Sequence, residues 1–101
     1  MNFALRYHPA VRDVDLPFID NKTRQRIKKA IEERLLVSPQ NYGIPLRKTL
    51  KGYWKMRVGD YRIVFKVVKN EIRILGIRNR KDIYQKITAR IDDTAVTAIH
   101  P

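Results

Sequence analysis

Residues 50–68 read LKGYWKMRVGDYRIVFKVV, and this stretch decides the fold. Apolar and polar side chains alternate from Trp54 to Val58, and the alternation resumes after Gly59-Asp60. A period of two is typical of a strand with one buried face, and Gly-Asp between two such runs is typical of a tight hairpin turn. The sequence therefore predicts an antiparallel hairpin here.

A third strand and the last helix are predicted downstream of the hairpin. A turn at Asn70-Glu71 leads to a strand over residues 72–77. Isoleucines spaced four residues apart then predict a helix over residues 81–91. We expect the three strands to be neighbours in one sheet.

A strand and two helices are predicted upstream of the hairpin. Residues 2–7 alternate like a strand, and a short helix over residues 10–16 is expected to break at Pro17. The second helix has apolar residues at i, i+4 and i+8. Its remaining faces carry many charged side chains, which form either a solvated surface or a contact for a partner. It is capped by Asp20 or Asn21, ends at Ser38-Pro39 and leads to a loop over residues 40–48.

This order of elements predicts an α+β domain. We expect a small, largely antiparallel sheet with an N-terminal strand, two N-terminal helices packed on one face and a short C-terminal helix. The length of 101 residues suits one domain, which we place over residues 1–91, followed by a C-terminal tail over residues 92–101.

The charge of the chain indicates a polyanionic partner. Lys and Arg total 22 against 10 Asp and Glu, and the net charge of +12 favours RNA, DNA, an acidic membrane surface or an acidic protein. The absence of cysteine excludes a disulfide scaffold and a thiolate zinc site. No apolar run is long enough for a signal peptide or a membrane span, so we expect a cytoplasmic protein without a membrane partner.

Basic side chains are expected to converge on one face of the sheet. Because the apolar residues of the first hairpin strand take one face, Lys55 and Arg57 must share the other. The tight turn places Arg62 close to this pair, and Arg78 and Tyr84 follow at the end of the third strand. We expect these residues to meet on the sheet face that no helix covers.

Such a cluster suits chemistry on RNA. Arginines bind phosphate bidentately and stabilise the charge that develops on a pentacoordinate phosphorus. RNA supplies its own nucleophile, the 2'-hydroxyl, so cleavage needs a proton acceptor and a proton donor but no metal or other cofactor. His8 and His100 lie far from the cluster in sequence, which leaves Tyr84 or Lys55 as acid or base. The alternative is a basic face that binds phosphate backbones without cleaving them.

Residues 50–68, together with IRNRKDIY at residues 77–84, resemble the RelE/ParE superfamily of toxins from toxin–antitoxin systems. The shared pattern is Leu-x-Gly, a strand of basic and apolar residues, Gly-Asp-Tyr-Arg, and a closing Arg-Lys-Asp-x-Tyr. The resemblance covers roughly residues 2–91 and implies a RelE-like fold.

RelE-like members of this superfamily are ribosome-dependent endoribonucleases that cut mRNA, and the resemblance implies the same activity here. It implies that Arg62 and Arg78 stabilise the scissile phosphate. It further implies that Lys55 and Arg57 tune the site and that Tyr84 takes the 2'-hydroxyl proton. Other basic residues are expected to bind RNA, namely Lys48, Lys51, Arg80 and Lys81.

The resemblance also implies a partner, and two other functions remain open. The partner is an acidic RelB-like antitoxin that forms a hetero-oligomer with the chain, and the target is mRNA on the ribosome. ParE-like members instead poison DNA gyrase and carry no nuclease residues. A third possibility is a member that binds nucleic acid without catalysis.

Overall fold

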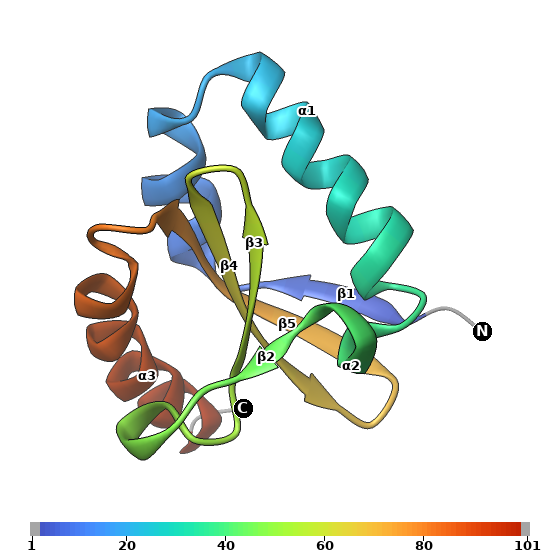
Figure 1. The fold of residues 1–101 in the computed structure, drawn as a ribbon. Helices are drawn as coiled ribbons and strands as arrows, with labels where there is room; N and C mark the ends of the chain where they lie inside the picture. The colour runs from blue at the N-terminus through green and yellow to red at the C-terminus, as the bar shows by residue number, and fades with distance from the viewer. Residues whose placement is uncertain (1–2, 100–101) are drawn as a thin grey trace.

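A five-stranded mixed sheet forms the centre of the fold (Figure 1). The computed structural model describes residues 3–99, with side chains through residue 91. The strands lie in the order β1-β5-β4-β3-β2, with β1 parallel to β5 and the other neighbours antiparallel. Their bounds are β1 Ala4–Tyr7, β2 Ile44–Pro45, β3 Trp54–Val58, β4 Tyr61–Val68 and β5 Glu71–Asn79. The predicted α+β class and the neighbouring hairpin strands are confirmed.

The main N-terminal helix forms as its cap and apolar spacing predict. α1 (Asn21–Ala30) begins after Asp20, whose side chain accepts a hydrogen bond from the backbone N–H of Thr23. It continues into a π-helical turn, η3 (Ile31–Leu35). The other helical segments are η1 (Val11–Asp15), η2 (Leu16–Phe18), α2 (Pro39–Tyr42), η4 (Lys48–Leu50) and α3 (Ile83–Ile99).

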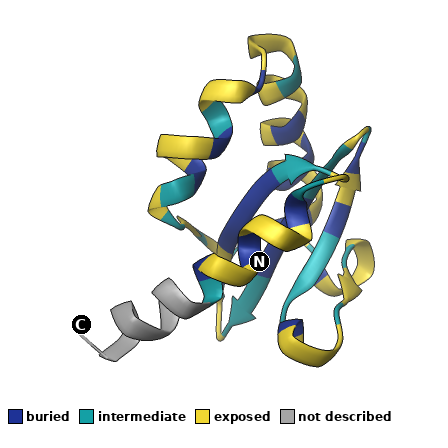
Figure 2. Cartoon of the chain, turned by 90° about the vertical axis from the view of Figure 1, so that its left-hand side faces the viewer, coloured by how far each residue is buried: buried dark blue, intermediate teal, exposed yellow. Residues whose placement is uncertain are grey.

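One face of the sheet packs against α1 and η3. Ile27 and Ile31 lie one turn apart and join a buried cluster with Met56 of β3 and with Ile63 and Phe65 of β4. Fully burying a side chain of this size contributes about 1.5–3 kcal/mol, so this cluster is the main core of the domain. In Figure 2 the buried sections of the strands face the inner sides of the helices, whose outer sides are exposed.

The other face packs against α3, so the prediction that the basic residues lie on an uncovered face is wrong. Val64 of β4 forms a second buried cluster with Ile83 and Ile87 of α3. The apolar stripe of α3 needs a surface to bury it, and the first face is already occupied by α1. Since Lys55 is the register partner of Val64, the basic residues of β3 lie beside α3.

Gly76 lets α3 approach the sheet closely. A Cβ atom at this position of β5 would lie 2.8 Å from Ile87 Cγ2 and 3.1 Å from Arg90 Nη1. Any side chain here would therefore push the helix away from the strand. This close approach helps to set the distance between α3 and β5.

Several element boundaries differ from the prediction. Pro39 begins α2 instead of only ending the preceding helix, because proline is well tolerated in the first turn of a helix. β2 lies within the predicted loop, and β5 runs on to Asn79, so Arg78 belongs to the sheet. The last helix extends to Ile99 rather than ending at residue 91. Residue 2 of the predicted first strand and residues 100–101 of the predicted tail lie outside the described residues.

Within residues 3–99, no helix combines the length and the apolar character that crossing a membrane requires.

Candidate active site

Three arginines lie in one row across the sheet. In the strand register, Arg57 of β3 faces Arg62 of β4, and Arg62 faces Arg78 of β5. Like charges directly opposite each other destabilise a sheet unless other charges compensate them. The structure thus brings together the arginines that the strand alternation and the tight turn led us to expect.

Lys55 and Tyr84 lie beside this row. Lys55 precedes Arg57 by two residues on β3, so both side chains leave the same face. The Lys55 Nζ atom is 5.8 Å from the centroid of the Tyr84 ring, which stands in the first turn of α3. Tyr84 is 36% exposed, so its phenol can be reached from solvent.

Arg62 is held in place by backbone carbonyls. Its Nη1 atom donates hydrogen bonds to the carbonyl oxygens of Gly59 and Tyr61, each at 3.1 Å. In the part of the chain whose side chains are described, no ion pair engages Lys55, Arg57 or Arg62. These cations are therefore available to an external anion.

Arg78, in contrast, is already paired with two carboxylates. Its Nη2 and Nε atoms bind the two oxygens of Asp82 at 2.8 and 3.1 Å, and its Nη1 atom is 3.1 Å from Asp15 Oδ1. These hydrogen bonds, with that of Asp82 foremost, raise the pKa of Arg78. The side chain is only 15% exposed. The two carboxylates use three of its five N–H donors and neutralise its charge, so Arg78 is less available to a phosphate than Arg57 and Arg62 are.

Asp15 is the centre of a buried polar network that the sequence analysis missed. Both Asp15 oxygens accept hydrogen bonds from Arg90 of α3 at 2.6 Å, and Oδ2 also accepts from the backbone N–H of Ile77 at 2.8 Å. Arg90 Nη1 also donates to the carbonyl of Leu75 at 3.2 Å. The network ties η1, β5 and α3 together. No local pattern signals it, because Asp15 and Arg90 are 75 positions apart.

The pairing of Asp82 with Arg78 predicts a dependence of stability on pH. The hydrogen bonds from Arg78 hold the pKa of Asp82 below its ordinary value in the folded protein. The stabilisation is present above the unfolded pKa and is lost as the pH falls below about 4 through the folded value. We expect acid to destabilise the Asp82→Asn variant less than the parent, modestly because Asp82 is partly exposed.

Urea unfolding at several acidic pH values measures this difference. Other carboxylates with lowered pKa values are unchanged by the substitution, so the difference between the two proteins isolates Asp82. Parallel losses of stability in parent and variant would contradict the assignment.

A hollow of about 330 Å³ opens at the edge of the sheet beside the cluster. Arg34 of η3 and Tyr42 of α2 contribute to the hollow, and the sequence pattern marks neither as a site residue. Tyr42 lies in a predicted loop, and Arg34 is one of many charges on a helix. The residues that line the hollow are Arg34, Tyr42, Ile44, Lys55, Met56, Arg57 and Arg62.

The residues expected to bind RNA separate into two groups. Arg80 and Lys81 are exposed between β5 and α3, and the Arg80 backbone N–H binds the carbonyl of Asp60 in the β3–β4 turn, so both lie near the arginine row. Lys48 and Lys51 are exposed in and after η4. Lys51 lines a different hollow, of about 620 Å³, which includes Tyr53, Lys66, Glu71 and Arg73. The structure does not bring Lys51 to the hollow that contains Lys55.

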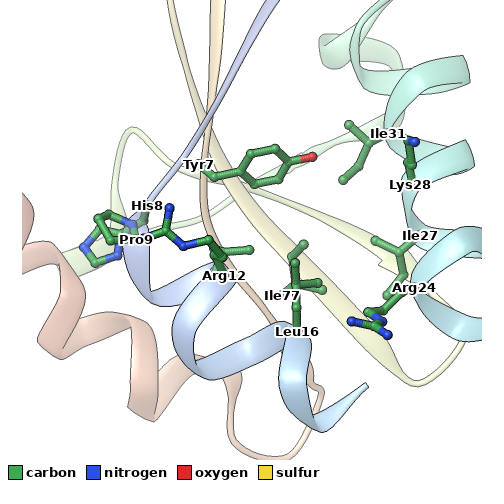
Figure 3. Close-up of a pocket in the computed structure, with 11 residues that line it drawn as sticks. Tyr7, His8, Pro9, Arg12, Leu16, Arg24, Ile27, Lys28, Ile31 and Ile77 are labelled. Atoms are coloured by element: carbon green, nitrogen blue, oxygen red, sulfur yellow. The ribbon is translucent and has the colours of Figure 1, made fainter. Parts of the chain in front are cut away.

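A further hollow of about 390 Å³ lies between β1, η1 and α1 (Figure 3). Its surface is mainly apolar and comes from side chains such as Leu16, Ile27 and Ile77. Three basic side chains contribute to it, namely Arg12, Arg24 and Lys28. This surface carries no catalytic set, but it can accept an apolar side chain from a partner.

In the part of the chain that the structure describes, no group of three or more His, Cys, Asp or Glu residues is placed to hold a metal ion. The residues gathered at the site are cations and a phenol, and this donor set suits an anionic ligand.

Solved structures share this fold. The RelBE2 toxin–antitoxin complex of Mycobacterium tuberculosis has a chain with a TM-score of 0.73 and 23% identity, covering 79% of this chain and all of that one. A mutant of E. coli RelE in the free state has a TM-score of 0.70 and 19% identity, covering 90% of this chain and 99% of that one. The RelB–RelE complex of Methanococcus jannaschii has a chain with a TM-score of 0.63 and 28% identity, covering 80% of this chain and 96% of that one. No curated protein sequence matches the chain.

The sequence itself matches a family. Residues 6–84 fit the family described as the ParE toxin of the type II toxin–antitoxin system parDE. The match begins in the second half of β1 and ends at Tyr84, so it includes β2 to β5 and the basic cluster. The chain therefore belongs to the ParE toxin family of the RelE/ParE superfamily and is a toxin of a type II toxin–antitoxin system.

Proposed function

We propose that this toxin is an endoribonuclease that cleaves mRNA on the ribosome and so inhibits translation. The observation that supports this proposal is the group of cations Lys55, Arg57 and Arg62 beside the exposed phenol of Tyr84. A surface that only binds a phosphate backbone needs cations but no phenol next to them. The combination suits phosphoryl transfer.

RNA brings the nucleophile for the proposed reaction. The 2'-oxygen attacks the adjacent phosphorus, the O2'–P bond forms and the P–O5' bond breaks. A base on the protein takes the 2'-hydroxyl proton, and an acid gives a proton to the leaving 5'-oxygen. The products are a 2',3'-cyclic phosphate and a 5'-hydroxyl end, and the balance of atoms requires no metal.

The geometry suggests a role for each group. Arg57 and Arg62 face each other and can bind the non-bridging phosphate oxygens, whose charge grows in the transition state. The two carbonyls that hold Arg62 orient its guanidinium before the substrate arrives. Tyr84 or Lys55 serves as the base. The other residue is the candidate acid for the leaving 5'-oxygen, because the Lys55 Nζ atom lies only 5.8 Å from the centroid of the Tyr84 ring.

Residues around this centre have supporting roles in the proposal. Arg78 stabilises the phosphate if it exchanges Asp82 for a phosphate oxygen, and otherwise it fixes the first turn of α3. Arg80 and Lys81 are placed to bind flanking phosphates. Lys48 and Lys51 are candidates for contacts with ribosomal RNA, because they are exposed and do not line the hollow at Lys55.

In vitro translation of a defined mRNA tests the function. The 5' ends of the mRNA are mapped by primer extension with and without the toxin. Cuts that appear only when ribosomes are present support the proposal. Intact mRNA with normal translation would contradict it.

The family match favours a second candidate, inhibition of DNA gyrase, because the matching family is the ParE family. Likeness to RelE at 19% identity shows the fold alone and does not decide between the two. A supercoiling assay with purified gyrase separates them. Loss of supercoiling together with intact mRNA would make gyrase the target.

The partner of a type II toxin is an antitoxin, and several solved structures of this fold are toxin–antitoxin complexes. We propose that the antitoxin here is acidic and covers the basic face. The apolar hollow of Figure 3 is a candidate seat for one of its amphipathic segments, because basic side chains stand among its apolar ones.

Charge reversal tests this contact. We expect Lys28→Glu with Arg24→Glu to weaken the complex with the antitoxin at least tenfold, because the acidic segment then meets like charge. Titration calorimetry with the purified antitoxin measures the affinity. Lys22→Glu, also exposed on α1 but outside the hollow, is the matched control. Equal affinity of the double variant and the control would place the antitoxin elsewhere.

A further inference from the structure

The hollow at Lys55 is one end of a longer basic groove. A second hollow, of about 570 Å³, shares Arg34 and Arg57 with it. The two hollows therefore adjoin at these side chains, and together they are called the β3 groove below. One side comes from α1 and η3 with Arg26, Lys29, Glu33 and Arg34, and the other from β3 and the β3–β4 turn.

The floor of the β3 groove is the open edge of β3. β2 pairs only with Trp54 and Lys55, so within residues 3–99 no strand pairs with the second half of β3 on that side. Arg26 reaches across from α1 to the β3–β4 turn, where its Nη1 atom lies 3.2 Å from the position of a Cβ on Gly59. The groove is therefore cationic on both sides along its length.

The β3 groove carries a large excess of positive charge. Its basic residues are Arg26, Lys29, Arg34, Lys55, Arg57 and Arg62. Glu33 is the one acidic residue among the described residues that line it. None of its cations takes part in the ion pairs found among the described side chains. Such a groove suits an extended polyanion.

An exposed aromatic ring stands at the end of the β3 groove. Tyr42 is 48% exposed, and the Arg34 guanidinium carbon is 5.9 Å from the centroid of its ring. Ile44 beside it is 60% exposed. A cationic groove with an aromatic platform is the arrangement by which proteins hold single-stranded nucleic acid, with phosphates on the cations and a base stacked on the ring.

We propose that the β3 groove binds the single-stranded RNA that flanks the scissile phosphate and that one base stacks on Tyr42. This inference rests on the proposed function, because the RNA in the β3 groove is the continuation of the RNA whose scissile phosphate lies at Arg57 and Arg62. An acidic protein segment also suits cations, but continuity with the phosphate site and the exposed ring favour RNA. Tyr42 then positions one base near the cut without reading its identity.

Binding of an uncleavable oligonucleotide tests the groove separately from catalysis. The probe is a short single-stranded RNA with 2'-deoxy sugars at the cleavable positions and one 2-aminopurine, and its affinity is followed by anisotropy. Stacking on Tyr42 quenches the 2-aminopurine. We expect Tyr42→Ala to weaken binding about tenfold and to abolish the quenching, and Tyr42→Phe to retain both.

Salt dependence separates the ring from the cations. Arg26→Ala should make the dependence of log affinity on log salt shallower by about 0.7, the contribution of one phosphate contact on a single strand, whereas Tyr42→Ala should leave the slope unchanged. Phe18→Ala, an exposed aromatic outside the groove, and Lys22→Ala are the matched controls and should bind like the parent.

Each contrary result has a distinct meaning. A parent that fails to bind the probe at low salt, or a Tyr42→Ala variant that binds and quenches like the parent, overturns the inference. If Tyr42→Ala weakens only the complex with the antitoxin, the groove is a protein site and the inference is again overturned. Tyr42-dependent binding with no mRNA cleavage during translation would retain the groove and reject the nuclease.

Discussion

Replacing Arg62 with Ala should slow mRNA cleavage by about a hundredfold or more, while the variant remains folded. Removing one preorganised donor to a developing oxyanion typically costs a factor of about 100 to 1000 in kcat. Arg62 fits this role because carbonyl oxygens already orient it and no carboxylate among the described side chains neutralises it. Its own bonds are to nearby backbone, so its loss leaves the core intact.

Tyr84→Phe should reduce cleavage by a similar factor if the phenol is the base. The substitution keeps the ring beside Lys55 and removes only the hydroxyl, so packing on α3 is preserved. Lys55→Met is the complementary variant, because it retains the Tyr84 hydroxyl. The single-turnover rate on ribosome-bound mRNA is measured as a function of pH for each variant. The variant that lacks the base loses the rise of the rate with pH, whereas the variant that lacks the acid loses the fall of the rate at higher pH.

The controls for these variants must address charge and folding. Lys22→Ala removes one exposed cation outside the site and should cleave like the parent. Circular dichroism and urea unfolding test whether each variant is folded. If folded Arg62→Ala and Tyr84→Phe both cleave mRNA at the parental rate, the proposed nuclease mechanism is wrong.

The fold and the centre of the site could be predicted because they depend on local patterns. The alternation through Trp54 to Val58 and the tight turn at Gly59-Asp60 determine the register. That register places Arg57 opposite Arg62. A period of two and a two-residue turn leave no freedom in this pairing, so a sequence reading reaches it without tertiary information.

The remainder of the site depends on contacts between distant elements. Arg34 and Tyr42 reach the β3 groove from η3 and from a helix of one turn, and neither segment has a periodic signal that indicates where it packs. The side of the sheet that α3 covers was likewise not predictable, because an apolar stripe specifies burial but not the surface that buries it. The close approach at Gly76 is visible only in the structure.

The buried network around Asp15 should make this residue the most sensitive position for stability outside the apolar core. We expect Asp15→Ala to lower the free energy of unfolding by about 3–5 kcal/mol, because it leaves the guanidinium of Arg90 buried without its counter-charge. A domain of this size is typically stable by about 5–15 kcal/mol, so the variant retains at best a marginal fold. Equilibrium unfolding in urea measures the loss.

A double-mutant cycle separates the pair from simple loss of packing. Arg90→Met alone and Asp15→Leu alone should each destabilise the protein, because each leaves a buried charge without its main partner. The variant with both Asp15→Leu and Arg90→Met should lose less than these two single variants combined. Asp13→Ala is the matched control, since its partner Arg12 is exposed and the ion pair is screened by water. A parental unfolding midpoint in Asp15→Ala would refute the role of the network. Strictly additive losses in the cycle would show that the two side chains stabilise the fold independently and would contradict the coupling of Asp15 with Arg90.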